Sequence, residues 1–210
     1  MKKLTLASFS ILAAVVLVAS GCGADTATSS KAAARRPSAP TCPATWRPGW
    51  QRLANRIHAP VYCPGWLPDP LIPQIGGKWN NIDSVSPDRS YLESFVWQET
   101  GPGLAGGELH VNLRGYPGRT AIPLCTRGGK AKGLIPCFSD PHGHVLLNGI
   151  DATMYTVNQD ADQWHVLLLW HLGGGLYTLS EHVAPPLTYR HVVAYLKREL
   201  RSLVLIEPSV

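Results

Sequence analysis

The middle of the chain alternates between apolar and polar side chains, which is the period of a β-strand with one buried face. The alternation is regular over residues 108–114, and the aromatic and β-branched stretch 91–99 predicts a second strand. Residues 164–171 are apolar at nearly every position, as in a strand that is covered on both faces. These three segments predict a sheet with a buried centre.

Short turns separate the predicted strands, so neighbouring strands should run antiparallel. Asn148-Gly149 stands between two apolar runs and is the strongest short hairpin signal in the chain. The glycine-rich stretches 101–107 and 173–175 predict two further turns.

The end of the chain has the pattern of an amphipathic helix. Thr188 is a suitable N-cap, and the residues after it place an apolar stripe at helical spacing, made of Val192, Val193, Leu196, Leu200 and Leu203. We therefore expect an α+β fold, in which a mostly antiparallel sheet is packed by a C-terminal amphipathic helix. Sheet and helix should occupy residues 91–210 of a single domain that spans 42–210. Residues 42–90, rich in Pro, Trp and Cys, should form an irregular, disulfide-stapled N-terminal cap.

The chain begins with features of a targeting signal. Lys2 and Lys3 give it a positive start, and residues 4–19 are almost entirely apolar. This stretch is shorter than the roughly 20 residues of a membrane-spanning helix, so a cleavable signal is favoured over an uncleaved anchor.

The end of this leader, Val18-Ala19-Ser20-Gly21-Cys22, resembles the lipobox of bacterial lipoproteins. The resemblance implies that residues 1–21 are a signal peptide and that Cys22 carries the acyl chains that hold the protein on the extracytoplasmic side of a membrane. Ala19 stands where that family prefers Leu, which leaves ordinary secretion as the alternative. Residues 22–41 lack large apolar residues, so we expect a disordered tether.

Four cysteines remain after Cys22, namely Cys42, Cys63, Cys125 and Cys137. An even number outside the cytoplasm predicts disulfides. Three pairings are open, and proximity favours Cys42–Cys63 with Cys125–Cys137. A zinc site is disfavoured because the sequence has no Cys-x-x-Cys pair.

The formal charge of +5 comes mainly from the leader and the tether, residues 1–41. Residues 42–210 contain 14 Lys or Arg and 13 Asp or Glu, a difference of +1. A nucleic-acid-binding domain concentrates positive charge on its own surface, so we expect the membrane and an envelope ligand or protein as partners, with no nucleic acid.

Common catalytic motifs are absent from the sequence, and we expect a non-enzymatic domain without a cofactor. His142 and His144 are the candidate metal ligands, because alternate residues of an extended chain point the same way and Asp140 is close. They would also serve a metal-dependent extracytoplasmic hydrolase, which is the alternative function. Ordinary turn material is the other interpretation of this segment.

Two further groups are candidate ligand contacts. Trp46, Trp50 and Trp66 could form an aromatic platform, or pack the cap where regular structure is sparse. Arg127, Lys130 and Lys132 lie in a glycine-rich loop that could bind an anion, or form a solvated hairpin tip.

The stretch 143–208 resembles small sheet-plus-helix modules of bacterial envelope proteins, through Val145-Leu-Leu-Asn-Gly-Ile, Val166-Leu-Leu-Leu-Trp170, Leu176-Tyr-Thr-Leu and Arg201-Ser-Leu-Val. This likeness implies a fold and no activity. We expect a membrane-anchored envelope lipoprotein with a ligand-binding or interaction domain, and a groove between sheet and helix for an apolar ligand. A purely structural or sensory interaction protein is a further alternative.

Overall fold

The computed structural model describes residues 39–99, 107–126, 133–159 and 162–209. Residues from Ser38 to Val210 form one compact unit. The expected signal peptide, Cys22 and most of the expected tether lie outside the described residues. Among the described residues, none of the helices combines the length and apolar character that crossing a membrane requires.

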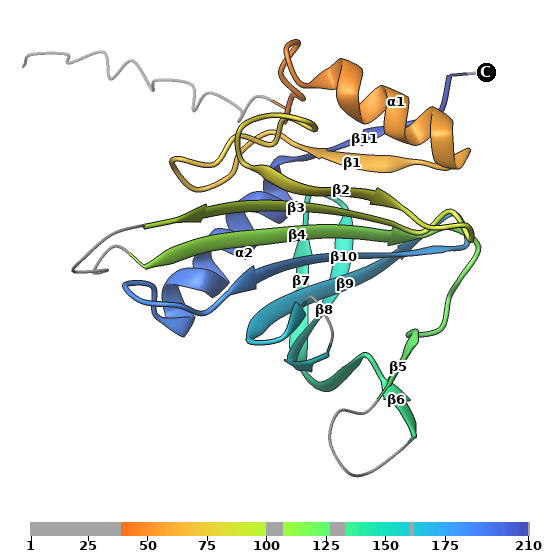
Figure 1. The fold of residues 1–210 in the computed structure, drawn as a ribbon. Helices are drawn as coiled ribbons and strands as arrows, with labels where there is room; N and C mark the ends of the chain where they lie inside the picture. Colours follow the sequence, from red (N-terminus) through yellow and green to blue (C-terminus); the bar gives the residue numbers. More distant parts are fainter. Residues whose placement is uncertain (1–38, 100–106, 127–132, 160–161, 210) are drawn as a thin grey trace, which may run out of the picture. The chain divides into compact units, whose positions relative to one another are not determined.

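Seven antiparallel strands form the main sheet, in the order β2-β3-β4-β10-β9-β8-β7 (Figure 1). The strands are β2 (Asn80–Val85), β3 (Tyr91–Gln98), β4 (Glu108–Tyr116), β7 (Phe138–Leu147), β8 (Ile150–Asn158), β9 (His165–Leu172) and β10 (Gly175–His182). Most strands pair with the strand that precedes or follows them in the chain. The exception is the pairing of β4 with β10, which is the last of the seven strands in chain order but lies at the centre of the sheet. The predicted antiparallel sheet is confirmed.

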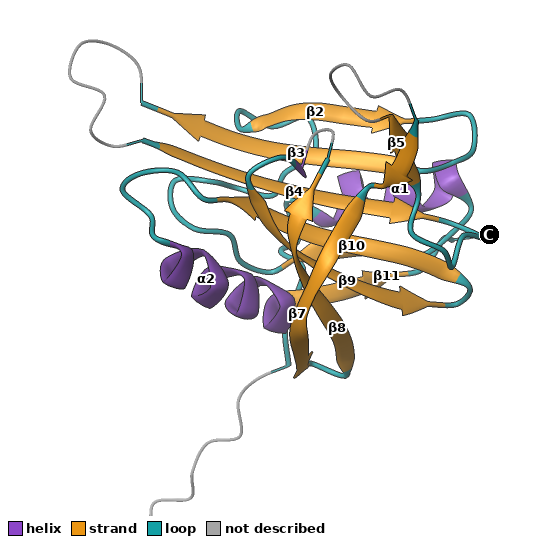
Figure 2. Cartoon of the chain, turned by 90° about the horizontal axis from the view of Figure 1, so that it is seen from below, coloured by secondary structure: helices purple, strands orange, loops and turns teal. Residues whose placement is uncertain are grey.

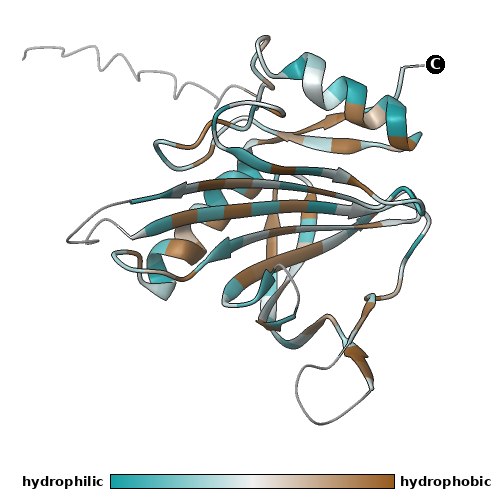
Figure 3. Ribbon diagram, in the orientation of Figure 1, coloured by the Kyte–Doolittle hydropathy of each residue, from teal (hydrophilic) through white to brown (hydrophobic). Residues whose placement is uncertain are grey.

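The hairpin predicted at Asn148-Gly149 joins β7 to β8, where Leu147 pairs with Ile150. Asn148 and Gly149 have φ values of 52° and 73°, the left-handed conformation that a two-residue hairpin turn requires at both positions. Strand β9 is buried from His165 to Trp170, as expected for a strand covered on both faces. Figure 3 shows the hydropathy of the residues along the sheet.

The C-terminal helix is confirmed as α2 (Tyr189–Ser202). The Thr188 side chain accepts a hydrogen bond from the His191 N–H, which caps the first turn. Leu203, expected on the helix, is instead the first residue of strand β11 (Leu203–Ile206). An extended backbone at this position ends the helix and turns the chain into a new strand.

Two more elements come from the segment expected to be an irregular cap. Helix α1 (Arg47–Ile57) begins with Pro48 in its first turn. Strand β1 (Val61–Pro64) pairs with β11 in a separate two-stranded ribbon. The main sheet also begins earlier than residue 91, because β2 starts at Asn80. Figure 2 shows the two helices in purple among the strands.

The main hydrophobic core covers one face of the sheet. It joins buried residues of α1, α2 and the β1–β11 ribbon to side chains of β3, β4, β9 and β10, with Trp50, Phe95, Tyr177, Leu196 and Leu200 among the largest fully buried side chains. Because Val192, Leu196 and Leu200 are fully buried here, the interface between α2 and the sheet is packed with protein side chains.

The opposite face of the sheet has a smaller apolar cluster. It contains Tyr116, Cys137, Phe138, Leu167, Leu169 and Leu176. Beside it lies a two-stranded ribbon of β5 (Leu124–Thr126) and β6 (Leu134–Pro136). The same face continues past this cluster into a group of polar side chains.

Both disulfides have the pairing that sequence proximity favours. Cys42 bonds to Cys63, which anchors the chain before α1 to strand β1. Cys125 bonds to Cys137, which ties strand β5 to the start of β7. Cys63 is fully buried in the main core.

Candidate metal centre

Three histidines lie side by side on the face of the sheet opposite α2. They come from three adjacent strands: His110 from β4, His182 from β10 and His165 from β9. His165 pairs directly with His182. Since Val111 pairs with Glu181, the antiparallel register brings His110 to the other side of His182. We call these three residues the histidine cluster.

The three rings contact one another. The centroids of His110 and His165 are 4.6 Å apart, and those of His165 and His182 are 5.3 Å apart. One ring nitrogen of each residue lies within 4.8 Å of the corresponding atoms of the other two. His165 is 3% exposed, whereas the side chains of His110 and His182 are 21% and 23% exposed. The cluster is therefore buried on one side and open to solvent on the other.

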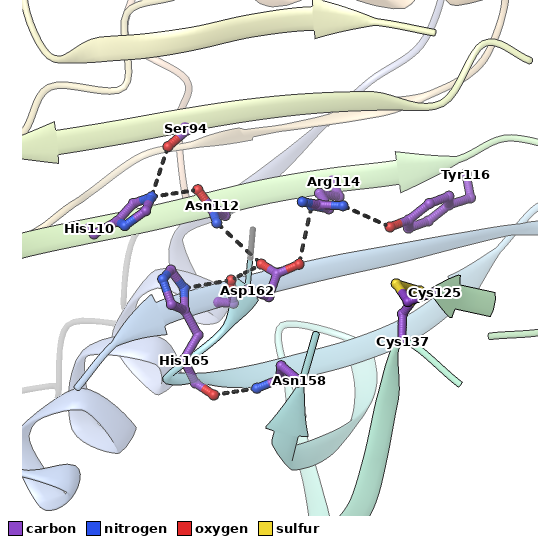
Figure 4. A network of polar contacts seen from close by, with 11 residues as sticks. Ser94, His110, Asn112, Arg114, Tyr116, Cys125, Cys137, Asn158, Asp162 and His165 are labelled. Atoms are coloured by element: carbon purple, nitrogen blue, oxygen red, sulfur yellow. Dashed lines mark hydrogen bonds and ion pairs between the residues drawn. A yellow bond between two sulfur atoms is a disulfide. The ribbon is translucent and has the colours of Figure 1, made fainter. Parts of the chain in front are cut away.

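A buried polar network contacts His165 at Nδ1 and fixes the orientation of its ring (Figure 4). Its Nδ1 is 3.0 Å from Ser180 Oγ, and the Ser180 hydroxyl donates to Asp162 Oδ1 over 2.6 Å. Asp162 also accepts from Asn112 Nδ2 at 3.2 Å and forms an ion pair with Arg114 Nε at 3.2 Å. Because the Ser180 proton goes to Asp162, Ser180 Oγ accepts from His165 Nδ1–H. Nε2 of His165 is left with a lone pair for a ligand.

Burial keeps this ring neutral. Desolvation, followed by the neighbouring His110, His182 and Arg114, lowers the pKa of His165 to about 2. Desolvation also lowers the pKa of His110, against the opposing effect of the Glu108 carboxylate. A neutral imidazole is the form that binds a metal ion, so His165 has the protonation state of a metal ligand near neutral pH.

Glu108 lies at the open side of the cluster, on β4. Its Oε1 is 3.2 Å from His110 Nδ1 and 3.3 Å from His182 Nδ1. The other nitrogen of the His110 ring, Nε2, is 3.0 Å from Ser94 Oγ and 3.1 Å from Asn112 Oδ1. Histidines that ligate metals commonly have such carboxylate and amide partners, which fix the ring orientation.

His142 and His144, the metal ligands expected from the sequence, lie on β7 and are exposed. A register shift between Pro141 and His144, together with Gly143 at φ 101°, interrupts the regular strand between them. The alternation that suggested a common direction therefore does not apply. His144 Nδ1 is 3.7 Å from Asp151 Oδ1, and Asp140 accepts a hydrogen bond from Thr156.

The tryptophans expected to contact a ligand pack within the protein. Trp50 is fully buried and donates from Nε1 to the carbonyl of Pro73 over 2.8 Å. Trp66 packs edge-on against Tyr195 and lies under the Arg198 guanidinium. Trp46 is half-buried against the main core.

The expected anion-binding loop cannot be placed in the same way. Arg127, Lys130 and Lys132 lie outside the described residues. The disulfide that was expected to close this loop is present.

The sequence pattern does not by itself bring the three histidines together, although it contains one signal. The turn between β9 and β10 is formed by Gly173-Gly174, so Leu172 pairs with Gly175. Continuing this antiparallel register residue by residue places His165 opposite His182. The polar side of β4 was interpreted as solvent-facing, yet Asn112 is 1% exposed. Only the pairing of β4 with β10 brings His110 to the other two.

Comparison with known proteins found no match among family models, curated proteins or solved structures.

Proposed function

We propose that this chain is a membrane-anchored envelope lipoprotein whose extracytoplasmic domain binds a divalent transition-metal ion at the histidine cluster. The observation that carries the proposal is the convergence of His110, His165 and His182 from three strands, with nitrogens within 4.8 Å of one another. Imidazole nitrogen is a preferred donor for zinc, copper and nickel ions.

The cost of building this cluster supports a bound ion. Polar imidazole rings occupy three neighbouring positions that apolar side chains could fill. One of them, His165, is buried with a pKa far below its usual value. Burying polar groups is unfavourable unless partners satisfy them. A metal ion would take up the lone pair of His165 Nε2.

Zinc is the ion whose preferences fit best. Three protein nitrogens with bonds of about 2.0–2.1 Å form a tetrahedral zinc site in many proteins. Ligand atoms on one such ion are about 3.3 Å apart, so the rings must move closer together when the ion binds. The His182 side chain is 23% exposed, and its rotation can supply this movement.

The proposed location rests on the chain's beginning and on its disulfides. The lipobox-like sequence at Cys22 supports lipid anchoring. Two disulfides in the folded domain support an oxidising compartment outside the cytoplasm. A domain held there would meet metal ions that enter the envelope.

The test is a metal-binding measurement on the mature full-length protein, purified in detergent. Elemental analysis after equilibration with zinc should give one ion per chain. Isothermal titration of a variant with His165→Ala and His182→Ala should show affinity at least about 100-fold weaker. His142→Ala with His144→Ala is the matched control and should bind as the wild type does.

Two results would count against the proposal. A wild-type protein that takes up no stoichiometric metal would end it. Loss of metal in the control variant alone would move the metal site to His142 and His144, and would favour the metal-dependent hydrolase expected as the alternative.

A further inference from the structure

We infer that Glu108 is itself a ligand of the metal ion, and that His110 binds the ion through Nδ1 and not through Nε2. This inference rests on the proposed metal-binding function and adds the composition of the site. It makes the centre a mixed imidazole and carboxylate site, with His182 beside Glu108 and His165 as the remaining nitrogen ligand.

The hydrogen-bond partners of His110 determine which of its ring nitrogens carries the hydrogen. Asn112 donates from Nδ2 to Asp162 Oδ1, so the amide oxygen of Asn112 faces the other way, toward His110 Nε2 at 3.1 Å. An amide oxygen can only accept a hydrogen bond. His110 Nε2 must therefore carry the hydrogen, and the Ser94 hydroxyl at 3.0 Å can accept from it as well.

The other nitrogen of the same ring is Nδ1. A metal ion binds the neutral form of imidazole, so once Nε2 carries the hydrogen, Nδ1 has the lone pair that can bind the ion. That lone pair faces Glu108 Oε1 across 3.2 Å. Two acceptors at this distance repel each other unless a positive centre lies between them. A metal ion at this point would convert the repulsion into two ligand bonds.

A further observation is the spacing of the atoms. Glu108 Oε1 lies 3.2 Å from His110 Nδ1 and 3.3 Å from His182 Nδ1. Ligand atoms on a tetrahedral zinc ion are about 3.3 Å apart. Two atom pairs, both including Glu108 Oε1, thus already have the spacing of ligand atoms on such an ion.

The competing arrangement keeps Glu108 out of the coordination sphere. In it, Glu108 would accept hydrogen bonds from Nδ1–H of both rings, and each ring would bind the ion through Nε2, as carboxylates behind metal-bound histidines do. His110 Nε2 would then have to leave both Ser94 and Asn112. The fixed direction of the Asn112 amide opposes that rearrangement.

Nuclear magnetic resonance of the imidazole nitrogens separates the two arrangements. The mature protein is labelled with ¹⁵N at its histidines, and long-range ¹H–¹⁵N spectra are recorded without zinc and with one equivalent. We expect His110 to carry its hydrogen on Nε2 in both states, and zinc to shift the Nδ1 resonance. A shift of His110 Nε2 on zinc binding would overturn the inference and leave the proposed function intact.

Substitution of two carboxylates provides the second measurement. Glu108→Gln should weaken zinc binding by more than about 100-fold, and should change the visible spectrum of the cobalt-substituted protein. Glu207→Gln is the matched control, because Glu207 is exposed and is not a partner of any ring of the cluster; it should bind zinc as the wild type does and leave the cobalt spectrum unchanged.

The outcomes are distinguishable. If Glu108→Gln binds zinc within a few-fold of the wild type with the same cobalt spectrum, Glu108 is not a ligand. If the wild type itself binds no zinc, the proposed function fails instead. Thermal unfolding of both variants shows whether they are folded. If Glu108→Gln does not fold, the nitrogen spectra of the wild type still show which His110 nitrogen binds zinc.

Discussion

The imidazole ring of His165 stacks on that of His182, with ring centroids 5.3 Å apart and planes 13° from parallel. The two residues are direct partners in the β9–β10 register, so the stacking is set by the sheet itself. Protonation of both rings would place two like charges face to face at a partly buried site. The arrangement therefore requires His165, the fully enclosed ring, to stay neutral.

Acid should destabilise the protein through His165. The pKa of His165 is about 2 in the folded state, against the ordinary value of 6.5 that applies to the unfolded chain. Between these values the unfolded chain binds a proton that the folded protein does not bind. The contribution is fully present above pH 6.5 and is lost as pH falls below it, by up to about 1.4 kcal/mol per pH unit. Urea unfolding at pH 7, 6 and 5 gives the pH slope of stability, and the slope of His165→Gln should differ from the wild-type slope by this amount. Comparing the two proteins removes the opposing effect of the buried carboxyls, which both share. His171→Gln, an exposed position on the same strand, should keep the wild-type slope; equal slopes for the two variants would contradict the assignment.

Alkali should destabilise the protein through a buried carboxyl pair. Glu181 of β10 and Glu199 of α2 are both 0% exposed, and neither carboxyl has a hydrogen-bond partner among the described residues. Burial raises the pKa of both groups, and the charge of Glu199 adds to the effect on Glu181. The folded state holds protons that the unfolded chain releases above pH 4.5, so stability falls as pH rises from there.

Glu199→Gln tests this alkaline effect, because a neutral side chain of the same shape has no proton to lose. The free energy of unfolding, measured from pH 5 to 9, should fall less steeply in this variant than in the wild type. Glu207→Gln, at an exposed position near the C-terminus, should leave the slope unchanged. A wild-type slope retained in Glu199→Gln would mean that this carboxyl is charged in the folded protein.

Loss of the Cys42–Cys63 disulfide should cost about 3 kcal/mol of unfolding free energy, because the bond restricts the unfolded chain over a sequence separation of 21. Paired substitution to Ala, followed by denaturant unfolding, measures the loss. The Cys125–Cys137 pair, with a separation of 12, should cost slightly less in the same model. A reversed order would show that packing, and not chain entropy, dominates at these sites.

Gly115→Ala should destabilise the centre of the sheet by about 2 kcal/mol. A Cβ at this position would lie 2.3 Å from Cε1 of Tyr91, and Tyr91 is 3% exposed, so its ring has little room to move. Denaturant unfolding measures the effect. In a double-mutant cycle with Tyr91→Ala, the two costs should be less than additive; full additivity would show that the two residues do not meet.

Cys22→Ser should release the protein from the membrane, because the lipobox-like sequence would no longer offer a thiol to receive acyl chains. Fractionation of the producing cells, with incorporation of labelled fatty acid, measures this. Cys42→Ser keeps Cys22 and should stay anchored and labelled. Membrane attachment that persists without label in Cys22→Ser would favour an uncleaved apolar anchor.

Local patterns determined most of the secondary structure. The alternation around β4, the apolar run of β9, the Asn148-Gly149 turn and the Thr188 cap all depend on residues close to one another in the chain, and the structure confirms each. The disulfide pairings followed from proximity for the same reason. Strand β11 was missed because an apolar residue after a helix has no local mark that assigns it to a strand.

The candidate metal site depends on contacts between distant segments. His142 and His144 were chosen because they are close in sequence, whereas the cluster takes one residue from each of three strands. The sequence determined that β4 has a polar face with Glu108 and His110 on it. Only the long-range pairing of β4 with β10 decided what that face meets, because strand register across a sheet is set by packing and not by any short turn between the two strands.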